Sequence, residues 1–133
     1  EDLEICMALR EEVFRREQGV PEAEEYDGLD GAAVHLLARL GEVPAGTLRL
    51  RRVGDAGKIE RVCVRREMRR KGVAAALTRA ALDELARWPG LREARLSAQL
   101  QVIGLYEAFG FVARGPVYDD VGIPHQDMTR PLR

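Results

Sequence analysis

Apolar and polar positions in the first half of the chain predict one helix followed by three strands. Residues 3–18 place apolar side chains among charges at roughly helical spacing, and Gly19 with Pro21 ends that helix. The polar segment 22–32 (EAEEYDGLDGA) is expected to be a loop. Three short runs then read as strands joined by tight turns and predict an antiparallel meander: residues 33–40, 47–53 and 58–64.

The second half of the chain alternates helical and strand patterns. Residues 73–88 carry apolar side chains at spacings of three to four, the pattern of an amphipathic helix, which Pro89 and Gly90 end. Residues 94–98 (ARLSA) read as a strand, and 102–109 show a second helical face. The last two strands are expected in 111–115 (FVARG) and 125–132 (HQDMTRPL).

This order of elements predicts the fold class, a single α/β domain with one mixed sheet and flanking helices. The two strands that follow helices are expected to adjoin the strand 58–64, so that helix 73–88 crosses over between parallel neighbours. The chain has 133 residues, 46% of them hydrophobic, which suits one sizeable core and is short for two domains. We therefore expect one domain over residues 1–133.

Composition excludes several classes of protein. No apolar run approaches the roughly 20 residues that cross a bilayer, and no signal segment opens the chain, so a cytoplasmic location away from membranes is expected. Cys6 and Cys63 lie far apart and form no C-x-x-C pair, which indicates buried thiols rather than a disulfide framework or a zinc site. The two histidines, His35 and His125, have no spaced acidic partner, and no metal is expected.

Charge is unevenly distributed, although the formal net charge is only −1. Residues 1–30 hold eleven acidic side chains against three arginines, a local net charge of −8. Residues 61–72 hold six basic side chains against one glutamate, a local net charge of +5. Two opposite fields are therefore expected, and they would attract ligands of opposite charge to different places.

The basic stretch 65–77 (RREMRRKGVAAAL) departs from the usual charge preference of a helix start. The helix expected from Gly72 has no acidic first turn and no side-chain cap, although a helix N-terminus already carries about half a positive elementary charge. An external anion would satisfy both the free N–H groups and the crowded cations, which favours a phosphate site. A solvated basic loop is the alternative. Neither G-K-[ST] nor G-x-G-x-x-G is present, so Walker-type and dinucleotide-type binding are not indicated.

The same residues carry a family resemblance. Arg69-x-x-Gly72-x-Ala74, after a predicted strand, resembles the acyl-CoA motif Q/R-x-x-G-x-G/A of the GNAT superfamily of N-acyltransferases. The run LSAQLQVIGLYEAFGFVARG resembles the second signature of that family. The segments LREEVFRREQGVPEAEEYD and VYDDVGIPHQDM extend the likeness to a bacterial ElaA-like branch, over nearly the whole chain.

The resemblance implies a single-domain GNAT-like fold, with a mixed, mostly antiparallel sheet, a central splayed parallel pair and flanking helices. It also implies that the first N-terminal strand of the family would precede Glu1. The implied activity is that of an N-acetyltransferase, in which a primary amine attacks the thioester of acetyl-CoA directly and no acyl-enzyme forms. The alternative is a domain of the same fold that binds acyl-CoA as a sensor or partner without transferring anything.

The resemblance also assigns the residues that bind CoA. Backbone N–H groups of residues 70–74 would hold the pyrophosphate, and the nearby arginines would steer and supplement. The main chain of Val62 and Val64 would pair with the pantetheine arm, and the amide near Val62 would donate to the thioester carbonyl as it becomes an oxyanion. The implied binding set is Val62, Cys63, Val64, Arg69, Arg70, Lys71, Gly72, Val73, Ala74 and Tyr106, in which the Cys63 side chain is interpreted as structural. The family often has Asn where this chain has Gln99 or Gln101, so no side-chain contact to CoA is expected from them.

Tyr106 is the expected general acid. Its spacing with Val102, Leu105 and Phe109 would also suit an ordinary core aromatic. The resemblance aligns it with the tyrosine that reaches the CoA sulfur. A phenol with a reference pKa of about 10 can protonate a departing thiolate whose conjugate acid has a pKa of about 8.5.

The base that accepts the proton of the amine has no comparably clear signature. Glu60 is one candidate, because it shares a strand face with Val62 and Val64 if no bulge intervenes. The competing interpretation is a surface carboxylate paired with Arg61 or Lys58. Glu17 is the alternative base, since the first helix and its following loop usually wall the acceptor pocket in this family. A base relayed through water remains a third possibility.

The acceptor itself is expected to be an amine. Carboxylates of the acidic segment, Glu17, Glu24 and Glu25 among them, would favour a cationic acceptor. His125 would either line the acceptor pocket with Tyr118 and Asp119 or stabilise a turn. Nucleic acid is not expected as a partner, because the domain is nearly neutral and has no recognisable base-reading element. The expected partners are acetyl-CoA or CoA and an amine, with the protein a monomer or a homodimer.

Overall fold

The structure, a computed structural model, describes residues 2–132, except for the side chains of Ala23 and Glu24. The helical elements are α1 (Asp2–Arg10), the π-helical η1 (Glu11–Glu17), α2 (Glu22–Glu25), α3 (Val73–Ala86), α4 (Ile103–Glu107) and the short 3-10 turns η2 (Asp30–Ala32), η3 (Arg66–Met68) and η4 (Leu100–Val102). The strands are β1 (Val34–Leu40), β2 (Val43–Val53), β3 (Ala56–Val64), β4 (Glu93–Gln99), β5 (Val112–Asp120) and β6 (Ile123–Pro131).

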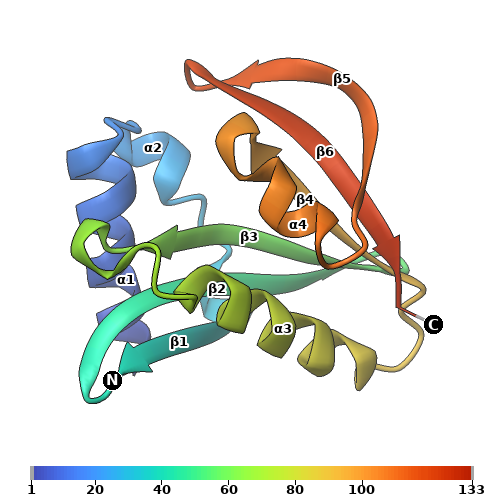
Figure 1. Ribbon diagram of the computed structural model, residues 1–133, viewed down its shortest axis with the longest axis horizontal. Coiled ribbons are helices and arrows are strands. Elements are labelled where there is room, and N and C mark those ends of the chain that lie inside the picture. The colour runs from blue at the N-terminus through green and yellow to red at the C-terminus, as the bar shows by residue number, and fades with distance from the viewer. Residues whose placement is uncertain (1, 133) are drawn as a thin grey trace.

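The strands form one six-stranded mixed sheet in the order β1-β2-β3-β4-β6-β5. The antiparallel meander β1-β2-β3 and the parallel pair β3-β4 connected by α3 are both as predicted (Figure 1). The expectation that both helix-following strands adjoin β3 is wrong for the second. β5 lies at the sheet edge because it forms a hairpin with β6, and β6 takes the place beside β4.

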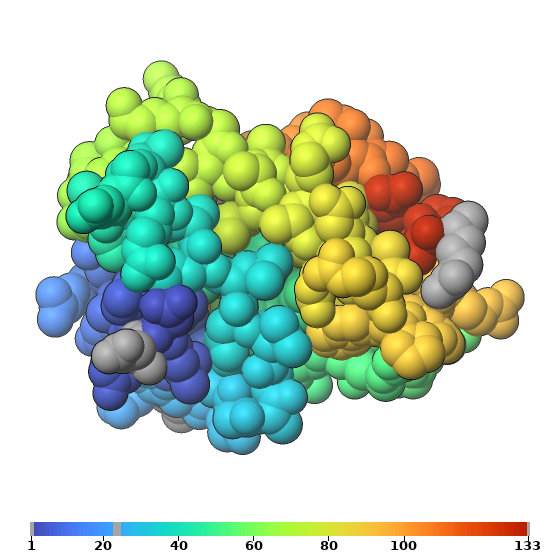
Figure 2. Space-filling view, turned by 90° about the horizontal axis from the view of Figure 1, so that it is seen from below, coloured from blue at the N-terminus to red at the C-terminus, as the bar shows by residue number. Residues whose placement is uncertain are grey.

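Opposite faces of the meander are covered by different helices. Leu48, Leu50 and Ile59 face α3 and belong to the main core with Leu77 and Leu85. A smaller core on the other face joins side chains of the first helices to the sheet: Leu9, Val13, Phe14 and Cys63. Figure 2, which views the molecule from below Figure 1, shows the blue segment of α1 and the yellow segment of α3 on either side of the cyan segment that contains β1. The alternation of side chains along each strand separates the two cores.

The parallel pair is short, and this creates the site. β3 pairs with β4 only from Ala56 with Glu93 to Ile59 with Leu96. Both strands continue beyond these pairs, to Val64 and Gln99, without pairing to one another. The splay expected from the family resemblance is therefore present, and it leaves one edge of β3 without a neighbouring strand.

Two predicted segments differ from the structure in detail. The polar segment 22–32 contains the helix α2 and the turn η2 rather than an unstructured loop. The last two strands are longer than predicted, since β5 and β6 run to a turn at Val121 and Gly122 and form a projecting hairpin (Figure 1). The tip of this hairpin contributes to the cleft described below.

Candidate active site

A cleft of about 850 Å³ opens where β3 and β4 separate. Its lining comes from η1, the separated halves of β3 and β4, the start of α3, α4 and the tip of the β5–β6 hairpin. The cleft volume lies in the range typical of small-molecule sites. All three predicted catalytic residues, Tyr106, Glu60 and Glu17, line it. The predicted CoA-binding residues line it as well, apart from Lys71, which is exposed beside it.

The start of α3 has the geometry of an anion site. Gly72 is the N-cap residue in a left-handed conformation, with φ of 82°, no side-chain capping hydrogen bond and no acidic residue in the first turn. The first intrahelical hydrogen bond runs from the N–H of Ala76 to the carbonyl of Gly72. The N–H groups of residues 73–75 therefore have no helical partner, and the positive end of the helix dipole faces the cleft. Arg70, with a positive φ of 62°, shapes the loop that leads into this helix.

The acidic first helices meet the basic loop directly, so the two predicted fields are not separate. Glu12 pairs with Arg65 at 3.2 Å. Glu17 accepts hydrogen bonds from both terminal nitrogens of Arg69, at 2.7 Å each. Because these pairs cancel charge, the basic stretch presents less net charge to the cleft than its composition indicates.

The free edge of β3 presents alternate main-chain groups to the cleft. The N–H of Arg65 donates to Ala45 on β2, which places the main-chain groups of Val62 and Val64 on the opposite, cleft side. The Val64 carbonyl already accepts a hydrogen bond from Nε of Arg69 at 2.9 Å. Arg69 therefore ties the edge of β3 to η1 through Glu17, a role that sequence reasoning did not anticipate.

A β-bulge changes the predicted orientation of Glu60. The β2–β3 register shifts between Thr47 and Arg49, and Arg61 on the bulged strand has a positive φ of 55°. The bulge places Glu60 on the α1 side of the sheet, whereas Val62 and Val64 pack against the main core on the α3 side. Glu60 and these valines, which were expected to share a face only in the absence of a bulge, therefore lie on opposite faces, because β3 has an extra residue there.

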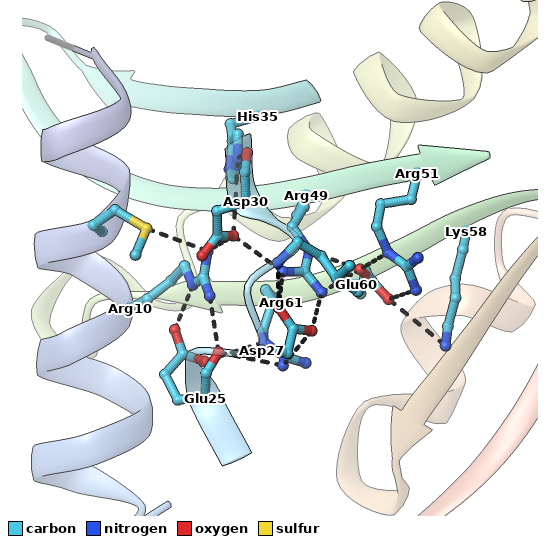
Figure 3. A network of polar contacts seen from close by, with 12 residues as sticks. Arg10, Glu25, Asp27, Asp30, His35, Arg49, Arg51, Lys58, Glu60 and Arg61 are labelled. Atoms are coloured by element: carbon cyan, nitrogen blue, oxygen red, sulfur yellow. Dashed lines mark hydrogen bonds and ion pairs between the residues drawn. The ribbon is translucent and has the colours of Figure 1, made fainter. Parts of the chain in front are cut away.

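Arginines surround the Glu60 carboxylate (Figure 3). Arg49 and Arg51 donate from Nε to Oε2, each at 2.6 Å, and Lys58 lies 3.6 Å from Oε1. Burial alone would raise the pKa of Glu60, but the hydrogen bonds and positive charge of Arg51 and Arg49 outweigh it and lower the pKa. Glu60 is thus an ionised carboxylate held in ion pairs. This is closer to the competing interpretation, a carboxylate paired with Arg61 or Lys58, than to a free base. Its partners, however, also include Arg49 and Arg51.

The same network connects residues 25–30 to the α1 side of the sheet (Figure 3). Arg10 from α1 pairs with Glu25 and with Asp30, and Arg49 from β2 pairs with Asp30 and with Asp27. The side chains of both arginines are 1% exposed. The acidic side chains that were expected to attract a cationic ligand are therefore largely occupied by arginines of the chain itself. Glu24, part of that expectation, lies outside the described side chains.

Glu17, the alternative base, is also held by a cation. The hydrogen bonds from Arg69, opposed by a smaller effect of burial, lower the pKa of Glu17. Glu25, by contrast, is a buried cleft residue whose pKa is raised by desolvation, against the opposing charge of Arg10. Glu25 was expected near the acceptor pocket, but its burial was not, because the polarity of EAEEYDGLDGA indicates exposure.

Tyr106 lies in the cleft wall on the α3 side. It is 4% exposed and packs edge-to-face against Phe111, with ring centroids 5.9 Å apart. Its hydroxyl makes no hydrogen bond with any described residue, and burial raises its pKa to about 12. Burial also raises the pKa of the Cys63 thiol to about 12 and leaves it protonated, as expected for a structural cysteine.

The acceptor-side wall is polar. Tyr118 and His125 both line the cleft, as one of the two interpretations of His125 required, and their rings stack with centroids 6.2 Å apart. Asp119 does not line it; its carboxylate accepts a hydrogen bond from the N–H of Gly122 in the hairpin turn. Asp120 contributes to the lining in its place.

Two further features of the cleft were missed from sequence. The amides of Gln18 and Gln99 are hydrogen-bonded across it, with Nε2 of Gln99 donating to Oε1 of Gln18 at 3.1 Å. Ser97 lines the cleft and is hydrogen-bonded to Tyr118. The alternation along 94–98, which buries Ala94, Leu96 and Ala98, is the sequence signal that could have placed Ser97 on the opposite face.

The described part of the chain carries neither a membrane-spanning helix nor a metal cluster. Across residues 2–132, none of the helices combines the length and the apolar character required to span a bilayer. Within the same residues, no three histidine, cysteine or acidic side chains gather as a metal site would require.

Comparison with known proteins agrees with this geometry. The family model of the acetyltransferase (GNAT) domain matches residues 4–132. YjcF of Bacillus subtilis, an uncharacterized N-acetyltransferase, is 37% identical over 131 residues, which cover 98% of this chain and 93% of YjcF.

Solved structures show the same fold over nearly the full length. An acyl-CoA N-acyltransferase from Pseudomonas aeruginosa superposes with a TM-score of 0.85 at 34% identity, covering 96% of this chain and 89% of that one. Escherichia coli ElaA gives a TM-score of 0.85 at 29% identity, covering 96% of this chain and 88% of ElaA. A Bacillus subtilis acetyltransferase solved in complex with CoA shares the fold, with a TM-score of 0.74 at 14% identity and coverage of 96% and 91%. The chain belongs to the GNAT family of acetyltransferases, with ElaA among its structural relatives.

Proposed function

We propose that the protein transfers an acetyl group from acetyl-CoA to a primary amine in the cleft between β3 and β4. The observation that carries this proposal is a juxtaposition: the uncapped start of α3, the free edge of β3 and the buried Tyr106 all line one cleft. The uncapped helix start suits a pyrophosphate, and the free strand edge suits an extended chain with amide groups. The buried tyrosine suits a leaving group that needs a proton.

In this proposal the donor is bound mainly by main-chain groups. The N–H groups of residues 70–75 hold the pyrophosphate, and Arg70 adds charge from the cleft wall. The pantetheine arm lies along β3 and pairs with the main chain of Val62 and Val64. Since the Val64 carbonyl already accepts from Arg69, a further donor must use its second lone pair. The Val62 N–H is aimed at the thioester carbonyl and stabilises the oxyanion that forms during attack.

Tyr106 donates the proton to the departing thiolate in this scheme. Its pKa of about 12 is higher than that of a free phenol. Burial disfavours the charged form of an acid, so it would raise the pKa of a departing CoA thiol in the same direction as that of the phenol.

The acceptor is proposed to enter on the α1 side, between β3 and the β5–β6 hairpin. Glu25, Glu60, Ser97, Tyr118 and His125 line this half of the cleft. Because arginines or a lysine pair with both carboxylates, net charge alone does not select a cationic acceptor. Hydrogen bonding in this polar wall is the better basis for selecting an amine.

The test is thiol release from acetyl-CoA with a panel of small amines, amino acids and peptides, comparing the wild type with Tyr106→Phe. We expect turnover with at least one amine, and a loss on the order of a hundredfold in kcat for the variant with unchanged CoA affinity. Undiminished turnover in Tyr106→Phe would rule the tyrosine out as the acid. CoA-dependent thermal stabilisation without thiol release for any amine would instead favour the non-catalytic sensor.

A further inference from the structure

A chain of hydrogen-bonded side chains leads out of the cleft on the acceptor side. Ser97 is the first residue of β4 beyond the last parallel pair, that of Ile59 with Leu96, and it lines the cleft. Its Oγ is hydrogen-bonded to Oη of Tyr118. The Tyr118 hydroxyl in turn donates to Oδ1 of Asp127 at 2.7 Å.

Strand register explains why these side chains meet. Ser97 on β4 pairs with Asp127 on β6, so both side chains project from the same face of the sheet. Tyr118 on β5 pairs with His125 on β6 and reaches back over that face. Asp127 is exposed and Tyr118 is 38% exposed. The hydrogen-bonded chain therefore begins at Ser97 in the cleft and ends at the solvent-exposed carboxylate of Asp127.

The direction of each hydrogen bond follows from the chemistry. An ionised carboxylate only accepts, so the Tyr118 proton is directed to Asp127. The phenol oxygen must then accept from the Ser97 hydroxyl. This leaves a lone pair of Ser97 Oγ able to accept a proton from a ligand in the cleft.

The carboxylates predicted as bases are less suited to this task. Glu60 is held by Arg49 and Arg51, and Glu17 by Arg69. Both carboxylates have pKa values below the ordinary range, despite the opposing effect of burial on Glu60. A guanidinium-bound carboxylate accepts a proton reluctantly, because protonation gives up the ion pair.

We propose that Ser97, Tyr118 and Asp127 form the path by which the acceptor amine loses its proton, an inference that rests on the acetyl transfer proposed above. The ammonium proton passes to Ser97 Oγ while the Ser97 proton moves to Tyr118 Oη and the Tyr118 proton moves to Asp127. The nitrogen lone pair that is set free attacks the thioester carbonyl. Asp127 then releases one proton to solvent, so the path gains and loses one proton per turnover.

Two further titratable neighbours of Tyr118, His125 and Asp120, lie on the same hairpin. His125 stacks on its ring, and Nδ1 of His125 donates to the Ile123 carbonyl at 2.7 Å. Asp120 is close enough to affect Tyr118 through its charge. The path from Ser97 through Tyr118 to Asp127 runs through neither of them, so removing the Tyr118 hydroxyl interrupts the path and leaves these neighbours in place.

The decisive experiment is the pH dependence of acetyl transfer by Tyr118→Phe, with saturating acetyl-CoA and the most reactive amine of the panel. At neutral pH we expect the rate to fall on the order of a hundredfold. The defect should shrink as the pH approaches the pKa of the amine itself, because the acceptor then arrives already deprotonated. CoA-dependent thermal stabilisation should stay unchanged, since the phosphate site lies at the start of α3.

Matched variants make the result specific. Ser97→Ala should reproduce the pH-dependent defect, and the double variant should lose no more than either single one, because both interrupt the same path. Tyr26→Phe is the control. Tyr26 donates to Glu11 at 2.9 Å and does not line the cleft, so its loss should leave the pH profile unchanged.

If the wild type is active, two results would overturn the proposal. One is wild-type activity in Tyr118→Phe at every pH, and the other is a defect of equal size at every pH, which marks a structural role. A wild-type protein that binds CoA and acetylates no amine would overturn the acetyl transfer itself and the proton path with it. An active wild type with an unaffected variant removes only the proton path.

Discussion

At the scale of single residues, the balance between burial and the nearest arginine decides whether the pKa of a cleft carboxylate is raised or lowered. Glu17, Glu25 and Glu60 are chemically alike in the sequence and differ in the structure. Glu17 and Glu60 have lowered pKa values through Arg69 and through Arg51 and Arg49, whereas desolvation raises the pKa of Glu25. These partners are distant in sequence, so no local pattern reveals them.

Glu17→Gln tests the consequence for donor binding. The substitution removes the negative charge that pairs with Arg69 at 2.7 Å and frees the guanidinium for phosphate. We expect CoA to bind equally well or a few-fold more tightly, a gain of up to about 1 kcal/mol, since the pair is partly exposed. Turnover should change by less than about tenfold. Calorimetric CoA titration and steady-state kinetics measure the two effects.

Arg69→Gln provides the opposite control for that experiment. It removes both the link to Glu17 and the hydrogen bond to the Val64 carbonyl, so CoA should bind more weakly. Loss of turnover in Glu17→Gln with CoA binding intact would show that Glu17 takes part in catalysis after all.

Some residues could be predicted from the sequence because their function depends on main-chain geometry or a recognisable motif. Gly72 in its sequence context predicts an uncapped helix start, and in the structure Gly72 is the N-cap residue with a positive φ. The face of Glu60 could not be predicted, because the bulge depends on a positive φ at Arg61, a residue type that does not signal such a conformation.

At the scale of elements, strands were recognised more reliably than their ends. The β5–β6 hairpin was predicted as two short pieces because Gly115, Pro116, Gly122 and Pro124 resemble strand breakers. In the structure Pro116 lies within a register irregularity of the edge strand β5, where the loss of an N–H donor is tolerated. For this reason the sequence prediction included too little of the hairpin that forms the acceptor-side wall of the cleft.

Gly46→Ala tests how closely the meander must pack to form the cleft. A Cβ at Gly46 would lie 2.7 Å from the Cys63 carbonyl oxygen and 3.1 Å from Val73 Cγ1. Because the nearest atom is backbone, β3 must move at Cys63, within the part of the strand that has a free edge. We expect a loss of about 1–3 kcal/mol in the free energy of unfolding, measured by urea denaturation, together with weaker CoA binding.

Gly104→Ala is the matched control for this substitution. Gly104 lies in α4 and shows no positive φ, and a Cβ added there would meet no heavy atom within 4 Å. Alanine should therefore be neutral or stabilise by up to about 1 kcal/mol through helix propensity. Equal destabilisation by the two substitutions would contradict the close approach at Gly46.

At the scale of the whole molecule, one ion network joins the N-terminal segments to the sheet that forms the cleft. Arg10 contributes from α1, Asp27 and Asp30 from the segment before β1, and Arg49 and Glu60 from β2 and β3. The overall α/β fold was predictable because apolar periodicity and turns specify it. The network was not, since composition shows only an acidic segment and cannot show that arginines from α1, β2 and β3 neutralise it.

Acid sensitivity follows from the carboxylates of this network. Hydrogen bonds from Arg49 lower the pKa of Asp27 well below its usual range, and the pKa values of Asp30 and Glu60 are lowered despite burial. A depressed folded-state pKa contributes stability that is present above the unfolded value, about 4 for these groups, and is lost as pH falls further. Glu25, with a raised pKa, opposes this trend.

Asp27→Asn tests this linkage. At pH 7 the variant should be less stable by about 1–3 kcal/mol, because Arg49 and Arg61 lose a charged partner. Below about pH 4 the wild-type carboxylate begins to lose the same advantage, so the two stability curves should converge as the pH falls. Urea denaturation at a series of pH values from 7 to about 2 measures the difference.

Asp83→Asn on α3 is the control. It removes an exposed carboxylate that has no ion pair with a described residue, so its stability curve should run parallel to that of the wild type. If the Asp27→Asn curve also runs parallel to the wild type down to low pH, the ion network does not link the fold to acidity through Asp27.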